Sequence, residues 1–204
     1  AHFRTAYDIS PESPIITILP GSRRGEIKRH LPVFTQVVQR LRFTYPHLVT
    51  VIATPSHLAA EMKEQLTRIN WPLKVVLVSD DKLKRDAFAA STLALTKSGT
   101  VTLELALANV PMIVTYQTSP LTAWLLRRMI RTKYVTLINI LLDRPLIPEL
   151  LQEQCNPAEL TKAVEALLSN PKARQQQTEG AHQALSLLRG NLPETPSEQA
   201  AKVV

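Results

Sequence analysis

The amino-acid sequence predicts an α/β protein with a doubly wound parallel sheet. Short runs of mostly branched apolar residues alternate with longer segments of helical periodicity, which is typical of repeated β-α units. The chain has 204 residues, of which 45% are hydrophobic and 20% are charged, and this is enough for one large domain with a buried core. We therefore expect a Rossmann-like domain with right-handed crossovers and with helices on both faces of the sheet.

The order of the elements follows from the periodicity along the chain. Five apolar runs are expected to be strands, at residues 15–19, 49–53, 74–78, 93–96 and 112–116. The segments between and after them predict helices at residues 32–44, 57–69, 83–90, 101–108 and 121–130. Because proline is costly inside a helix, Pro32 predicts that residues 24–30 form a short turn and that the main helix begins near Leu31.

The pattern changes after Arg131, and no clear period returns until Glu149. Asn156 as a cap and Pro157 in the first turn then predict a helix, and residues 171–188 predict another. Residues 190–196 are expected to form a loose connection, and Ser197 to cap a final, truncated helix. We therefore expect one domain at residues 1–190, C-terminal helices included, followed by a connection and terminal helix at residues 191–204.

The charge of the chain favours anionic partners. The formal net charge is +7 and the isoelectric point is about 9.8. Nucleic acid is not expected as a partner, because the sequence has no basic and aromatic stripe, no zinc-finger spacing and no RNA-binding signature. The five histidines are scattered and there is a single cysteine, so we expect no metal site and no cofactor, and a reducing compartment. The apolar runs are far shorter than the roughly 20 residues of a membrane-spanning helix.

Two loops are candidates for binding a ligand, because ligands of doubly wound sheets lie beyond the carboxyl ends of the strands. In the first loop, Gly21 permits close backbone approach, Ser22 offers a hydroxyl, and Arg23 and Arg24 can form bidentate contacts with phosphate. Arg23 is expected to contribute more than Arg24, since one helical step of about 100° turns Arg24 away. The alternative is a capped turn with two solvated arginines.

The second loop follows the fourth expected strand and supplies Ser98, Gly99 and Thr100 at a helix start, which is typical of an anion cradle. Glu104, on the first turn of that helix, could accept hydrogen bonds from ribose hydroxyls or could only stabilise the helix dipole. Neither loop is a Walker A motif or a G-x-G-x-x-G fingerprint, so ATP hydrolysis and NAD binding have no support.

Three segments together resemble a known family. They read LPGSRRGEIKRHLPVF, KSGTVTLELALANVPMIVTYQTSPLTAWLLRRMI and YVTLINILLDRPLIPELLQEQC, and they resemble in order the C-terminal half of bacterial lipid-A-disaccharide synthase. The likeness runs over residues 15–168, and its L-P-G-S-R and S-G-T-x-T-L-E motifs are specific. That family is an inverting glycosyltransferase of the GT-B type, with two Rossmann-like halves, so the resemblance implies that this chain is one half.

The resemblance implies transfer of diacylglucosamine from UDP-2,3-diacylglucosamine to 2,3-diacylglucosamine 1-phosphate, with release of UDP, in lipid A biosynthesis. It implies that this half binds the nucleotide sugar without a metal. It also implies a location in the cytoplasm at the inner membrane, and it allows a homodimer of the full-length enzyme. Arg23 is the candidate catalytic residue. The implied nucleotide-sugar-binding residues are Gly21, Ser22, Arg23, Ser98, Gly99, Thr100 and Glu104, with Asn139 and Glu149 as weaker candidates.

Two departures from the family pattern bear on these expectations. Ile138 stands where the family usually has proline before the asparagine that is here Asn139. The half that should hold the acceptor pocket and the carboxylate base has no counterpart in this sequence, and the first residue is not Met. We therefore expect a piece of a longer enzyme that does not catalyse the transfer alone.

A basic and apolar helix is expected within SPLTAWLLRRMIRTKY, where Trp124 and several leucines accompany Arg127 and Arg128. It either packs on the core with a solvated basic face or contacts an anionic membrane surface. Two other function classes remain open: half of an enzyme related to UDP-N-acetylglucosamine 2-epimerase, and a non-catalytic nucleotide-binding module. Ring-binding residues without an acyl groove would favour the first of these, and failure to bind UDP would favour the second.

Overall fold

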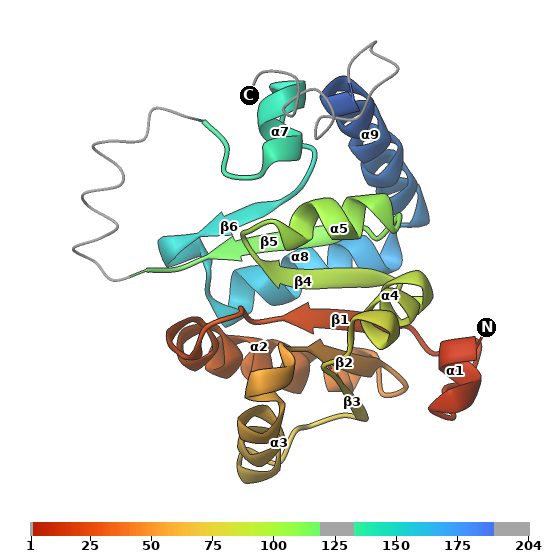
Figure 1. Cartoon of the computed structure of the whole chain (residues 1–204), viewed down its shortest axis with the longest axis vertical. Helices are drawn as coiled ribbons and strands as arrows, with labels where there is room; N and C mark the ends of the chain where they lie inside the picture. The colour runs from red at the N-terminus through yellow and green to blue at the C-terminus, as the bar shows by residue number, and fades with distance from the viewer. Residues whose placement is uncertain (1, 119–132, 190–204) are drawn as a thin grey trace, which may run out of the picture.

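A six-stranded parallel sheet forms the centre of the domain in the computed structural model, which describes residues 2–118 and 133–189 (Figure 1). The strand order is β3-β2-β1-β4-β5-β6, and all five pairs are parallel. The expected fold class is therefore confirmed. The strands are β1 (Ile15–Leu19), β2 (Val49–Ala53), β3 (Val75–Val78), β4 (Leu93–Lys97), β5 (Met112–Tyr116) and β6 (Glu149–Leu151).

Helices cover both faces of the sheet, and alternate strand residues point to each face. One face packs on α2 (Arg24–Thr44), α3 (Ala59–Arg68) and α8 (Pro157–Ser169), with Ile16, Ile18 and Leu95 in the shared core. The other face packs on α4 (Asp81–Ala90), α5 (Val101–Leu107), α7 (Leu137–Leu142) and α9 (Pro171–Arg189), and on the short α1 (His2–Ala6). Figure 1 shows α4 and α5 in front of the sheet and α8 behind it.

The expectation of a turn before Pro32 is wrong, because α2 runs without interruption from Arg24 to Thr44 with the proline inside it. The helix continues because residues on both sides of Pro32 are buried in one core, among them Ile27, Leu31 and Phe34. Proline in a helix costs about 3 kcal/mol, whereas each buried apolar side chain contributes about 1.5–3 kcal/mol. The packing of this face outweighs the missing hydrogen bond.

Other differences from the expected elements are small or concern short segments. The helix expected at residues 57–69 divides into a 3-10 turn, η1 (Ser56–Leu58), and α3. The elements α1, α7 and β6 were not predicted, because three to six residues are too few to show a period. Asn156 caps α8 as expected, with its Oδ1 accepting hydrogen bonds from the N–H groups of Ala158 and Glu159. The helix expected at residues 121–130, and residues 190–204, lie outside the described residues.

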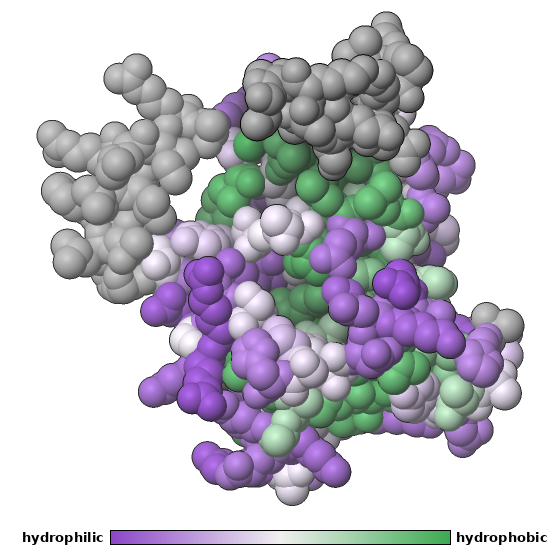
Figure 2. All heavy atoms as spheres, viewed as in Figure 1, coloured by the Kyte–Doolittle hydropathy of each residue, from purple (hydrophilic) through white to green (hydrophobic). Residues whose placement is uncertain are grey.

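The face shown in Figure 2 has a polar and an apolar region. Mostly hydrophilic residues lie over α2, α3 and α4, whereas hydrophobic residues gather between α5, α7 and α9, and the outer side of α9 is hydrophilic. The apolar region includes exposed Leu107, Ile140 and Leu187. Within residues 2–118 and 133–189, no helix is both long and apolar enough to cross a membrane.

Candidate functional site

A cavity of about 400 Å³ lies at the carboxyl ends of four strands. The last residues of β1, β2, β3 and β4 line its floor, and the loops that follow these strands form its walls. This is the edge of the sheet at which doubly wound folds bind ligands. The lining residues are Leu19, Gly21, Ser22, Glu26, Ala53, Thr54, Pro55, Ser56, Val78, Ser79, Asp80, Asp81, Lys84, Lys97, Ser98, Gly99, Thr100, Val101 and Glu104.

The first loop closes on a side chain of its own helix. Gly21 has φ 131°, a backbone conformation that favours glycine, and a Cβ there would come within 2.5 Å of the Cβ and 2.6 Å of the Oε2 of Glu26. The N–H of Ser22 donates to that same Oε2 at 2.9 Å. The backbone of the Gly21-Ser22 turn therefore already holds an anion, the carboxylate of Glu26.

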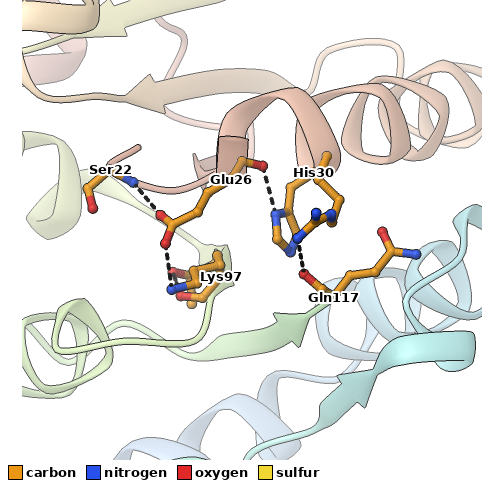
Figure 3. A network of polar contacts seen from close by, with 7 residues as sticks. Ser22, Glu26, His30, Lys97 and Gln117 are labelled. Atoms are coloured by element: carbon orange, nitrogen blue, oxygen red, sulfur yellow. Dashed lines mark hydrogen bonds and ion pairs between the residues drawn. The ribbon is translucent and has the colours of Figure 1, made fainter. Parts of the chain in front are cut away.

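Glu26 also pairs with Lys97, the last residue of β4 (Figure 3). The Nζ of Lys97 lies 3.1 Å from the Oε1 of Glu26, and the two side chains are only 21% and 19% exposed. Burial acts to raise the pKa of Glu26, but the hydrogen bonds from Ser22 and Lys97 outweigh it and hold the pKa below its usual value. Glu26 is thus a stably ionised carboxylate between the two loops.

His30 fixes the same turn of α2 from the core side. His30 is 1% exposed, and its Nδ1 lies 2.9 Å from the carbonyl oxygen of Glu26 (Figure 3). Its ring packs on the ring of Phe34. Burial is the main cause that lowers the pKa of His30, so the ring is neutral at neutral pH and its Nδ1–H donates to this carbonyl. The Nε2 atom has no hydrogen-bond partner among the described residues.

The second loop forms the opposite wall of the cavity. The N–H of Ser98 donates to the carbonyl of Thr115 at 2.7 Å, so this residue is fixed to the neighbouring strand β5. Thr100 is the N-cap position of α5, although its side chain makes no capping hydrogen bond. A Cβ at Gly99 would meet no described atom within 4 Å, so there is open space beside this residue. The loop offers hydroxyls and accessible backbone to a ligand.

A chain of charges links the two helices at the far side of the cavity. Lys84 of α4 contacts Oε2 of Glu104 at 2.9 Å and Oδ1 of Asp81 at 3.3 Å. Burial acts to lower the pKa of Lys84, but its hydrogen bonds to both carboxylates outweigh this effect and raise the pKa. Glu104 is 48% exposed and lines the cavity, so it is accessible to a ligand as well as to Lys84.

The remaining predicted residues lie outside the cavity. Neither Arg23 nor Arg24 is among the described residues that line it. Arg23 is the exposed N-cap of α2 with an extended backbone, and the Nε of Arg24 donates to Glu61 of α3 at 2.9 Å.

Asn139 and Glu149 belong to a separate hydrogen-bond network at the start of α7. Asn139 is 0% exposed, and its side chain bonds to both the N–H and the carbonyl of Ile147 and to Oε1 of Glu149. The carboxylate of Glu149 also accepts the N–H groups of Val135 and Thr136. The structure thus joins these two predicted residues to each other and not to the two loops.

Sequence reasoning missed several charged residues of the cavity, namely Glu26, Lys84, Lys97 and the Asp80-Asp81 pair. A signal existed for Lys97, because it directly precedes Ser98 at the end of a predicted strand. Asp80 likewise follows β3 and caps α4 through the N–H groups of Lys82 and Leu83. No signal in the sequence joined Glu26 to Lys97.

The strand order and the cavity at the carboxyl edge define a Rossmann-like domain, and solved glycosyltransferases and sugar-nucleotide epimerases share its fold. WaaG, a glycosyltransferase involved in lipopolysaccharide biosynthesis, has a similar structure: the TM-score is 0.60 and the identity 17%, over 100% of this chain and 50% of that chain. The UDP-GlcNAc 2-epimerase of Neisseria meningitidis, solved bound to UDP-GlcNAc, gives a TM-score of 0.58 at 14% identity, over 93% of this chain and 48% of that one. At these identities the likeness is one of fold.

Comparison of its sequence with known families shows the family to which this chain belongs. The family model described as lipid-A-disaccharide synthetase matches residues 1–204, and the chain belongs to this family. The lipid-A-disaccharide synthase of Rhodospirillum centenum is 45% identical over 203 residues, which are 99% of this chain and 50% of that protein. The chain spans about half the length of the curated relatives it matches.

Proposed function

We propose that this chain is the nucleotide-sugar-binding half of a lipid-A-disaccharide synthase, and that its cavity holds the UDP part of UDP-2,3-diacylglucosamine. The observation that carries the proposal is the cavity at the carboxyl ends of β1–β4, walled by Ser98, Gly99 and Thr100, in a chain of this family. The whole enzyme would transfer diacylglucosamine to 2,3-diacylglucosamine 1-phosphate and release UDP.

Charged groups of the protein would stabilise the leaving diphosphate in this reaction. Arg23 is proposed as one of them in the complete enzyme, because it is exposed beside the cavity loop that holds Gly21 and Ser22. Arg24 is already paired with Glu61 and is the weaker candidate. Within the described part of the chain, no group of three or more His, Cys, Asp or Glu side chains could hold a metal ion. We therefore propose binding of UDP that needs no added metal.

UDP is expected to raise the melting temperature of this chain in the presence of EDTA. At a concentration 100 times its Kd, a ligand stabilises the folded state by about 2.7 kcal/mol, which corresponds to a shift of about 5–10 °C for a domain of this size. The melting temperature is measured by thermal unfolding in EDTA and in magnesium chloride, each with and without UDP. Absence of a shift at millimolar UDP in both conditions would contradict the proposed function, and a shift with magnesium alone would contradict metal independence.

Glu104→Gln is expected to weaken UDP binding by about tenfold or more, since a hydrogen bond to a charged group is worth about 1.5–3 kcal/mol. Lys84 contacts Oε2 of Glu104, and we propose that Oε1 accepts a ribose hydroxyl. The free energy of unfolding should change by less than about 1 kcal/mol, because the carboxylate is 48% exposed.

Isothermal titration calorimetry measures this effect, with Glu64→Gln as the matched control. Glu64 forms an exposed pair with Arg68 on α3 and does not line the cavity, so its removal should leave the affinity for UDP unchanged. Equal affinities of Glu104→Gln and the parent chain would leave Glu104 as a partner of Lys84 only.

The acylated substrates imply that the whole enzyme works at a membrane surface, on its cytoplasmic side. The proposed contact is the basic and apolar sequence around Arg127 and Arg128. This segment lies outside the described residues, so the proposal rests on its composition and on the chemistry of the substrates.

A further inference from the structure

Among the described residues that line the cavity proposed for UDP, negative side chains outnumber positive ones. Four carboxylates and two ammonium groups of this part of the chain line it; these are Glu26, Asp80, Asp81 and Glu104, and Lys84 and Lys97. Two unit charges 4 Å apart interact by about 1 kcal/mol in water and by about 4 kcal/mol near a protein surface. A diphosphate is therefore repelled over much of this cavity, and its position depends on the ammonium groups.

The two lysines differ in how far their charge is already neutralised. Lys84 contacts two carboxylates, those of Asp81 and Glu104. Lys97 contacts one, that of Glu26, and the Oε2 of that carboxylate also accepts the N–H of Ser22. An anion in the cavity is therefore attracted more strongly to Lys97 than to Lys84.

The position of Lys97 is fixed from two sides. Glu26 holds the ammonium group at 3.1 Å, and the ring of Tyr116 lies 5.7 Å from Nζ. Because an ammonium group has three donors, those not used by Glu26 remain for a ligand. Lys97 is followed directly by Ser98 and Gly99, and all three residues line the cavity. Lys97 is therefore beside the Ser98-Gly99-Thr100 loop, which we propose as the other contact of the diphosphate.

Glu26 is held in place at the cavity by the first loop and by His30. Its carboxylate accepts the Ser22 N–H, and its carbonyl oxygen accepts the Nδ1–H of His30 (Figure 3). Its Cβ lies within 2.5 Å of the position that a Cβ at Gly21 would take. Glu26 thus stays with the first loop and leaves Lys97 as the group that can make the contact. A ligand phosphate would share Lys97 with Glu26.

We propose that Lys97 binds the diphosphate of the nucleotide sugar, and that Glu26 is a positioning residue that holds the Lys97 ammonium group at the cavity. This inference rests on the proposed function, since it names a residue that recognises UDP in the same site. It assigns the phosphate contact to the end of β4, in addition to the loop after it.

The test compares the Kd of UDP with the Kd of uridine, both measured by NMR titration of the 204-residue chain. Lys97→Met should weaken UDP binding by about tenfold to a hundredfold, as expected for loss of a charge-assisted hydrogen bond, and should leave uridine binding within about twofold. Lys97→Met combined with Glu26→Gln removes both charges of the pair and should give the same loss of preference for UDP. The matched control is Lys162→Met, which removes an exposed positive charge of α8 and should change neither constant.

The outcomes separate this inference from the proposed function. If the parent chain does not bind UDP, the proposed function fails and Lys97 has no role in it. If the parent chain binds UDP and Lys97→Met retains its preference for UDP over uridine, the inference is wrong while the proposed function stands. An equal loss of UDP and uridine binding would show a purely structural role for Lys97, which also overturns the inference.

Discussion

Replacing Asn139 by alanine is expected to lower the free energy of unfolding by about 3–5 kcal/mol, since buried partners left without hydrogen bonds cost about 1–3 kcal/mol each. Asn139 is 0% exposed and makes three hydrogen bonds through its side chain, two to the backbone of Ile147 and one to Glu149. Ile147 is 1% exposed, so water cannot replace these bonds without a rearrangement. The chain between α7 and β6 should lose its fixed geometry.

Urea unfolding followed by circular dichroism measures this loss. Asn156→Ala is the matched control, because it removes the half-buried cap of α8 and should cost only about 1 kcal/mol. If Asn139→Ala retained the parent stability but lost affinity for UDP, the residue would serve the ligand and not the fold. That outcome would restore the role that the family resemblance implied for it.

The sheet was predictable because its strands are apolar runs of four or five residues, separated by helical periods. Three strands have the expected bounds, and the other two differ by one residue. β6 could not be found in this way, since it has three residues and begins with Glu149, whose carboxylate is bound by the α7 loop. Pro32 misled the prediction because local propensity carries no information on the burial of Ile27 and Phe34 around it.

The candidate site was predictable only in part, for a related reason. Ser98, Gly99, Thr100 and Glu104 lie within one short segment, and their position after a strand is sufficient to place them. The Glu26–Lys97 pair joins the first turn of α2 to the end of β4, and it forms because β1 lies next to β4 in the sheet. No periodicity or motif in the sequence indicates an ion pair between two residues so far apart in the chain. The sequence predicts a phosphate site or a capped turn in the first loop, and the structure adds that the Ser22 N–H of this loop donates to Glu26.

Gly21→Ala is expected to lower the free energy of unfolding by about 2–4 kcal/mol, of which about 1–3 kcal/mol is backbone strain at positive φ. Gly21 has φ 131°, and a Cβ there would come within 2.5 Å of the Glu26 side chain. Glu26 would have to move, and its hydrogen bond with the Ser22 N–H and its pair with Lys97 would weaken together.

Gly99→Ala is the matched control for this prediction, because a Cβ at Gly99 meets no described atom within 4 Å and should leave the stability unchanged within about 0.5 kcal/mol. The double variant Gly21→Ala, Glu26→Gly, compared with Glu26→Gly alone, separates the two causes, since Glu26→Gly removes the Cβ that a side chain at Gly21 would meet and leaves only the backbone strain. Urea midpoints of these chains should rank the parent and Gly99→Ala highest. A Gly21→Ala chain as stable as the parent would mean that the turn relaxes freely. The Gly21-Ser22 backbone would then be available to a ligand phosphate, and Glu26 would not be the anion that shapes this loop.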